Sequence, residues 1–324
     1  MGTMRLVVDV RDQRSPTEVS IDRLSELLAD DTNRIWLDIA DPSMAEVALL
    51  RREFGFHRLT LEEVLKPHER PHCDAHGSYY FIVVYAAEHT ATEFVPHELN
   101  LFWGPNYLVT IHRNAPTVTK VLERARQRWQ QHEGRHEYGV PCLAYGLFES
   151  LVDGYFTVQD RVRERIEAIE GAVFEGTEGA AVELFRLRKE LLRVPRLLGP
   201  TARILAEVLR REGTIPEGLR PYFDDVQDHA QHVISGLDTY RDLLGAALDV
   251  HVFSAFNRLG LIMKRLTAVT VIIMVPNFVA SVYGMNFSHL TPASDSWYAF
   301  PILVAVLGCM VVWGFIHSRL LGWL

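Results

Sequence analysis

Two long apolar runs dominate the C-terminal end of the chain. Residues 266–283 and 297–316 comprise 18 and 20 positions without a charged side chain. An α-helix rises about 1.5 Å per residue, so each run is long enough to cross a hydrocarbon core of roughly 30 Å. The alternative is a pair of helices buried in a soluble protein, but such helices rarely run so far without a charge. The pattern therefore predicts two transmembrane helices.

The residues before the first apolar run predict one long helix. Pro221 suits the first turn of a helix, and no proline occurs from residue 222 to residue 263. A helix that continues from there into the first run has about 60 residues and a length of roughly 90 Å. We call residues 221–283 the stalk helix. No small domain can enclose a helix of this length, so we expect it to pack against copies of itself.

The first 112 residues alternate between short β-rich runs and helical stretches. Strands are expected at residues 4–10, 34–40, 79–87, 98–104 and 107–113. Residues 41–55 and 60–66 have a helical pattern, and Asp41 is the expected N-cap with Pro42 at the first helical position. This part of the chain therefore predicts an α/β sheet domain.

From about residue 115 the pattern becomes helical. Helices are expected at 115–134, 143–174 and 182–212. The last of them should bend or break at Pro195 and at Gly199–Pro200, because proline removes a helical hydrogen bond. The second and third should pair as an antiparallel hairpin.

The expected fold class is α+β: an α/β sheet domain with long helices, followed by the stalk helix and two transmembrane helices. Outside the membrane we expect a sheet domain at 1–142 and a helical hairpin at 143–220. The stalk helix follows at 221–283, and its membrane part is expected at about 264–283. The remaining segments are an external loop at 284–296, a second transmembrane helix at 297–317 and a tail at 318–324.

The charge distribution gives an orientation in the membrane. Basic or titratable residues flank the two spans on the sides away from their connector: Arg258, Lys264, Arg265, His317 and Arg319. The connector has no Lys or Arg and a single acid, Asp295. The positive-inside rule then places the connector outside and both termini in the cytoplasm. The expected location is the inner (plasma) membrane of the cell. The net charge of −8 argues against a general nucleic-acid surface, and three cysteines provide no disulfide framework.

The sequence Tyr-Gly-Met-Asn-Phe stands at residues 283–287, where the chain leaves the first span. Two C-terminal spans, this motif, a short connector and a basic tail together resemble the CorA family of magnesium channels. Further similar stretches are LEEVLKPHERP (61–71), SLVDGYF (150–156), YFDDVQDH (222–229) and the stalk residues 240–250. The resemblance implies a homopentamer in a lipid bilayer that transports Mg²⁺, with Co²⁺ and Ni²⁺ as further candidates. Mg²⁺ is then both cargo and regulator, and no organic cofactor is implied.

The resemblance assigns Gly284, Met285 and Asn286 to a selectivity filter. Mg²⁺ gives up its six waters reluctantly. A ring of neutral carboxamides can bind the outer face of the hydrated ion, and Asn286 supplies an acceptor and a donor without a charge that would trap it. Gly284 suits the end of a helix, and Met285 supplies apolar packing. The other interpretation is a polar loop after a glycine C-cap.

One face of the first span matches the family's pore-lining positions. Its members are spaced 3, 4, 4 and 3 residues apart: Met263, Leu266, Thr270, Met274 and Asn277. Asn277 in the middle of a membrane is costly unless it faces water or a partner. Met263 and Leu266 would form an apolar constriction that gates by dewetting. Lipid or helix packing is the alternative for the apolar members.

The resemblance also assigns regulatory metal sites between subunits to acids outside the membrane. Glu62, Glu63 and Asp225 fall at the matching positions, and Asp153 is a further candidate. Carboxylates from two subunits repel each other until a cation lies between them, so Mg²⁺ would hold the channel closed. Ordinary exposed acids are the alternative. The stalk acids Asp228, Asp238, Asp242 and Asp249 are likewise open to two interpretations, a solvated face or a cation-attracting stripe.

Two departures from the family pattern affect the choice of ion. Gly260 stands where the family often has an asparagine, and residues 288–294 lack the glutamates that many members have after the motif. Two alternatives therefore stay open. One is a Zn²⁺ transporter of the related ZntB branch, and the other is a metal sensor that is tethered to the membrane and does not transport.

Two metal-like motifs are set aside. Residues 132–136 read H-E-x-x-H, but a glycine interrupts the helix that this zinc-protease pattern needs. His68, His72, Cys73 and His76 form a second group, and Pro71 breaks the helical spacing that would align them. Neither these groups nor any nucleophile or nucleotide motif supports an enzyme.

Overall fold

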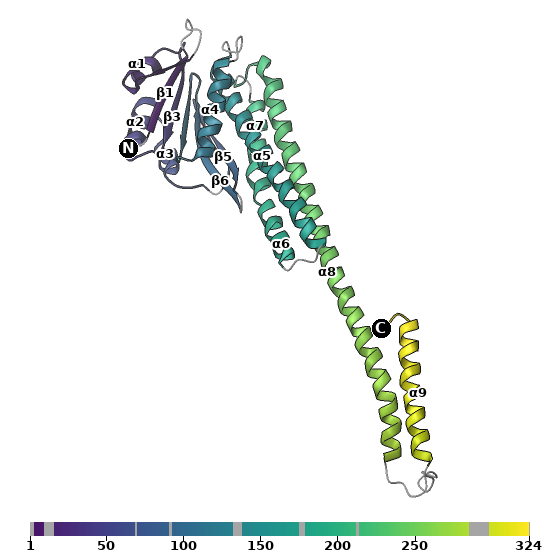
Figure 1. Ribbon diagram of the computed structural model, residues 1–324. Helices are drawn as coiled ribbons and strands as arrows, with labels where there is room; N and C mark the ends of the chain where they lie inside the picture. The colour runs from purple at the N-terminus through teal and green to yellow at the C-terminus, as the bar shows by residue number, and fades with distance from the viewer. Residues whose placement is uncertain are drawn as a thin grey trace. The chain divides into compact units, whose positions relative to one another are not determined.

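The computed structural model describes residues 3–9, 16–68, 70–90, 93–131, 138–174, 179–211, 214–284 and 298–323 (Figure 1). The chain divides into two compact units, residues 1–246 and 247–324. Helix α8 (Arg220–Gly284) contributes residues to both units. Each unit is described by itself.

The first unit is built on a seven-stranded sheet with the order β2-β1-β3-β7-β6-β5-β4. The strands are β1 (Thr3–Asp9), β2 (Thr17–Val19), β3 (Arg34–Ala40), β4 (His72–His76), β5 (Tyr79–His89), β6 (Phe94–Trp103) and β7 (Tyr107–His112). Neighbouring strands are antiparallel except for the parallel pair β3 and β7. All five predicted strands are confirmed, whereas the short β2 and the polar β4 were not predicted.

The two faces of the sheet are covered by different elements. Tyr80 pairs with Trp103 across β5 and β6, and Trp103 stacks on Phe223 of α8 with ring centroids 6.3 Å apart. The next pair, Phe81 and Phe102, points to the opposite face because side chains alternate along a strand. There Phe56 stacks on Phe102 at 4.2 Å. The core therefore continues on both sides of the sheet.

The segment between β3 and β4 carries two helices, α2 (Met44–Phe54) and α3 (Arg58–Val64). The N-cap of α2 is Ser43, which forms a capping box with Glu46, so the prediction of Asp41 as N-cap was wrong. Asp41 instead has a positive φ of 52°, and its carboxylate accepts the backbone N–H of Asn114 at 3.1 Å. It closes the turn after β3.

The remaining helices of this unit include the predicted long pair. They are η1 (Ile21–Arg23), α1 (Leu24–Leu28), α4 (Pro116–Gln131), α5 (Val140–Phe174), α6 (Ala180–Leu191), α7 (Val194–Arg210) and η3 (Glu217–Leu219). Helices α5 and α6 contact each other, and α4 and α5 pack on β5. The predicted break near Pro195 is confirmed, because α6 ends at Leu191 and α7 begins at Val194.

At the second predicted site of a bend or break, Gly199–Pro200, the helix is not broken. Pro200 lies inside α7, where it removes one backbone hydrogen bond. One face of α7 is buried along its length, including Leu198, Leu205 and Val208. Burial of this face offsets the loss of one bond, as is usual for helices whose stability comes from tertiary packing.

The second unit contains the end of α8 and the helix α9 (Ala299–Leu320). The predicted continuation of the stalk helix into the first span is confirmed, because α8 is a single helix of 65 residues with Pro276 inside it. Within the described residues, two helices are long and apolar enough to cross a membrane: the one that ends at Val282 and the one over Pro301–Leu320.

Candidate ion pathway and divalent-cation sites

Helices α8 and α9 pack against each other through one narrow face of each. On α8 beyond residue 251 the less exposed of the described side chains are Ala268, Ile272, Pro276 and Val279, at spacings of 3 and 4. On α9 they are Leu303, Leu307, Met310, Gly314 and Ser318. A Cβ at Gly314 would lie 3.2 Å from Cγ1 of Ile272, so glycine allows the close approach of the two helices.

The predicted pore-lining residues lie on the other side of α8. Met263, Leu266, Thr270, Met274 and Asn277 are all exposed, and Met274 is 64% accessible. At 3.6 residues per turn, the mean direction of these five is roughly opposite to that of the residues that contact α9. The chain thus leaves this face free for a partner or for water.

This face has polar side chains at two positions along the helix, Thr270 and Asn277. The hydroxyl of Thr270 donates to the backbone oxygen of Leu266 at 2.8 Å, which keeps its oxygen lone pairs available. The Asn277 amide has no hydrogen-bond partner among the described residues. An amide left unpaired in hydrocarbon is costly, so this side chain needs water, an ion's hydration shell or another chain.

Only part of the predicted filter lies among the described residues. Gly284 is the last residue of α8. Met285 and Asn286 lie outside the part of the chain that the structure describes. The same holds for the H-E-x-x-H motif at residues 132–136.

The four predicted regulatory acids lie on three elements. Glu62 and Glu63 are on α3, Asp153 is on α5 and Asp225 is on α8. Arg58 donates to Glu62 at 2.7 Å, and this hydrogen bond lowers the pKa of the carboxyl. Among the described residues, these four acids do not come together as one metal-binding group within the chain.

The other two acids differ in how free they are. Asp153 is held by Arg128 at 2.7 Å, so its charge already has a partner. Asp225 is 61% exposed and lies 3.7 Å from Nε2 of His229. Asp225 is therefore the more available ligand for a cation that approaches from outside the subunit.

The acids further along α8 are partly paired. Arg241 lies 2.8 Å from Asp238 and 3.1 Å from Asp242. All three side chains are on the solvent side of the helix, with exposures between 34% and 73%. This pairing favours the interpretation as a solvated helix face.

The histidine-rich segment forms a strand instead of a helix. His72 and His76 lie four residues apart on β4, a separation of roughly 13 Å that prevents them from sharing an ion. Cys73 points to the other side, and burial raises the pKa of its thiol to about 12. Two members of the group that was set aside on sequence grounds, His68 and His72, do come together, with Glu63 as third member. The sequence carries little signal for this group, because its members lie on a helix, in the loop after it and on a strand, and so share no regular spacing.

Comparison with known proteins gives a consistent family. The sequence profile of the family described as "CorA-like Mg2+ transporter protein" matches residues 31–317. The cobalt/magnesium transport protein CorA of Thermotoga maritima is 28% identical over 305 residues, which cover 91% of this chain and 85% of that protein.

Solved structures have the same fold. The CorA magnesium transporter of Methanocaldococcus jannaschii superposes with a TM-score of 0.84 at 22% identity, covering 99% of this chain and 98% of that one. The cytoplasmic domain of ZntB from Vibrio parahaemolyticus gives a TM-score of 0.64 at 10% identity over 79% of this chain and 100% of that one. The match to the full-length transporter extends over the sheet unit, the long helix and both apolar helices.

Proposed function

This chain belongs to the CorA-like Mg²⁺ transporter family, and on that premise we propose that it forms a channel for Mg²⁺, with Co²⁺ and Ni²⁺ as further ions. Five copies form the channel in a cell's inner (plasma) membrane, with both termini in the cytoplasm. The relative in Thermotoga maritima, named a cobalt/magnesium transport protein, supports this choice of ions.

The observation that carries the proposal is the free face of α8. Met263, Leu266, Thr270, Met274 and Asn277 are exposed in the single chain and point away from α9. Copies of α8 arranged around an axis would bring these faces together, give Asn277 a hydrated environment and leave α9 toward lipid. Met263 and Leu266 would then form the apolar gate, and Thr270 and Asn277 would line the wider, wetted part.

Asn286 is the proposed selectivity element. Gly284 ends α8, so the following residues are the first beyond the helix. A ring of Asn286 carboxamides accepts hydrogen bonds from the waters of a hydrated Mg²⁺ and leaves the inner shell intact. Met285 supplies apolar packing that holds the ring.

Gating is proposed to use Mg²⁺ between subunits. Glu62 and Glu63 lie on α3 and Asp225 lies on α8. Glu63 and Asp225 are exposed, and neither has a short ion pair to an arginine or lysine among the described residues. Carboxylates from two neighbouring subunits would share a bound ion and hold the closed state. Asp153 is less suited to bind Mg²⁺ because its carboxylate already forms an ion pair with Arg128.

Ion flux into liposomes that contain the purified protein tests the proposal. We expect Mg²⁺ to enter and Mg²⁺ inside the liposomes to suppress that entry. Zn²⁺ entry that follows a pH gradient and ignores internal Mg²⁺ would assign the protein to the ZntB branch. Absence of flux for every ion, with the oligomer intact, would leave a membrane-tethered sensor.

A further inference from the structure

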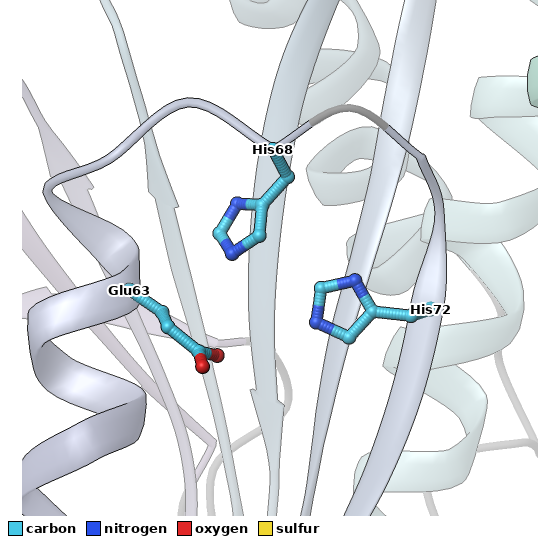
Figure 2. A group of neighbouring side chains, drawn as sticks. All are labelled: Glu63, His68 and His72. Carbon is cyan, nitrogen blue, oxygen red and sulfur yellow. The ribbon is translucent and has the colours of Figure 1, made fainter.

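Three side chains of types that can ligate a metal converge beside the sheet, from a helix, the loop after it and the next strand. Glu63 comes from α3, His68 from the loop after it and His72 from the first position of β4. Figure 2 shows the Glu63 carboxylate and the two imidazole rings turned toward a common space. One ligand atom of each residue lies within 4.8 Å of those of the other two.

His68 is oriented as metal-binding histidines usually are. Its Nδ1 lies 2.9 Å from Oε1 of Glu98, and its backbone N–H donates to Oε2 of the same carboxylate at 2.7 Å. Since an ionised carboxylate only accepts, Nδ1 carries a proton, and in the neutral imidazole Nε2 then has a free lone pair. A carboxylate that fixes the non-ligating nitrogen is the common outer partner of a metal-bound histidine.

The Nε2 atom of His68 has no other use in the described part of the chain. It is buried and has no hydrogen-bond partner there. A buried nitrogen with an unused lone pair costs free energy, so its retention needs an explanation. An ion bound at Nε2 would supply the missing partner.

The surroundings hold the imidazole in place. Tyr85 donates its hydroxyl to the backbone oxygen of His68 at 2.6 Å, and Asn100 donates to Glu98 at 2.9 Å. Phe81 packs against both histidine rings, and its ring centroid lies 6.1 Å from that of His68 and 5.6 Å from that of His72. This apolar floor and the fixed outer carboxylate limit the motion of His68, which lowers the entropic cost of binding an ion.

We propose that Glu63, Nε2 of His68 and His72 form a binding site for one transition-metal cation, Zn²⁺, Co²⁺ or Ni²⁺. Imidazole nitrogen suits these ions, whereas Mg²⁺ prefers oxygen ligands and keeps most of its water. Two histidines and one glutamate leave a fourth position for water. The site therefore distinguishes transition metals from Mg²⁺, which the acid-only sites do not.

Small side-chain movements complete the site. Ligand atoms bound to Zn²⁺ lie about 2.0–2.2 Å from the metal, so the present spacing has to close by on the order of 1 Å. His68 is fixed, while Glu63 is exposed and His72 is one-third exposed. The contacts of His72 are weak: Nδ1 lies 3.3 Å from the oxygen of Arg70, and Nε2 lies 3.9 Å from Asp74. These two side chains can therefore turn toward the ion.

The test is a Co²⁺ titration of the full-length protein in detergent, with excess Mg²⁺ present to occupy oxygen-only sites. Visible absorption reports nitrogen ligation of Co²⁺. The wild type should bind one Co²⁺ per chain with a spectrum that Mg²⁺ does not abolish and Zn²⁺ does. His72→Asn and Glu63→Gln should each weaken Co²⁺ binding by about 100-fold or more. Loss of a residue that hydrogen-bonds to a ligand lowers metal affinity by about 10–100-fold, and loss of the ligand itself should lower it at least as much.

His76→Asn is the matched control, because His76 lies on the same strand and outside the site. It should bind Co²⁺ as the wild type does. His72→Asn uses a partly exposed position, so it tests the site even where a change at His68 prevents folding. Wild-type affinity and spectrum in both His72→Asn and Glu63→Gln would overturn the site, as would equal losses in the control. The titration measures binding and not flux, so its result is separate from the proposed transport.

Discussion

At the scale of single residues, Asn277 is the side chain whose surroundings demand the most explanation. It is an exposed amide in an apolar helix segment, and it has no hydrogen-bond partner among the residues that the structure describes. Asn277→Leu removes the polar group from the proposed water-filled path, and we expect Mg²⁺ flux to fall by about tenfold or more. Liposome flux measures this.

Phe278→Leu is the control for that change. Phe278 is its neighbour in the chain, is 68% exposed and points about 100° away around the helix. It should keep wild-type flux. Equal losses in both variants would show a general disturbance of the span, and unchanged flux in Asn277→Leu would remove Asn277 from the path.

Asn286 carries the second prediction at this scale. Asn286→Ala removes the carboxamide ring that is proposed to bind the waters of Mg²⁺. Mg²⁺ uptake should be abolished while the oligomer, measured by size-exclusion chromatography with light scattering, stays intact. Normal uptake in this variant would contradict the filter.

Sequence patterns located some of these residues and missed others for a physical reason. The helical period places the five residues from Met263 to Asn277 on one side of α8, the resemblance to the family selected that side, and all five are exposed in the structure. The approach of Glu63 to His68 and His72 depends instead on where a loop turns and on the pairing of β4 with β5. Such tertiary contacts leave no periodic signal.

At the scale of elements, the contact between α8 and α9 depends on Gly314. A Cβ at Gly314 would lie 3.2 Å from Cγ1 of Ile272, whereas a Cβ at Gly308 would have no neighbouring atom within 4 Å among the described residues. Gly314→Leu should destabilise the packed pair by about 1–3 kcal/mol, the usual cost of overpacking. Thermal unfolding in detergent should show a lower midpoint for Gly314→Leu than for Gly308→Leu. The reverse order would contradict this packing.

The elements themselves were largely predictable. Strands with apolar runs, such as β5 and β7, and the continuous helix α8 were expected at nearly their observed bounds. The strand β4 was missed because its sequence HCDAH is polar and its pairing with β5 supplies the strand geometry. Of the bend or break expected at Pro200, the break does not occur, because burial of one face of α7 outweighs the local preference.

At the scale of the whole molecule, the proposed sensor predicts protection by Mg²⁺. Millimolar Mg²⁺ should slow proteolysis of the wild-type oligomer, because ions between subunits hold the closed state. The double variant Glu63→Gln with Asp225→Asn should lose most of that protection. His72→Asn keeps both acids and should retain it, which separates the sensor from the transition-metal site. Full protection in the double variant would exclude these acids from sensing.

The central claim is that the face of α8 opposite α9 lines the ion path. Thr270→Cys, in a background without the native cysteines, places a thiol on this face. Val271→Cys places one at the next position, about 100° away, on an exposed side that faces neither α9 nor the proposed path. The decisive measurement is Mg²⁺ flux before and after a charged, membrane-impermeant thiol reagent. The account predicts block of Thr270→Cys and no effect on Val271→Cys, whereas block of Val271→Cys alone would contradict it.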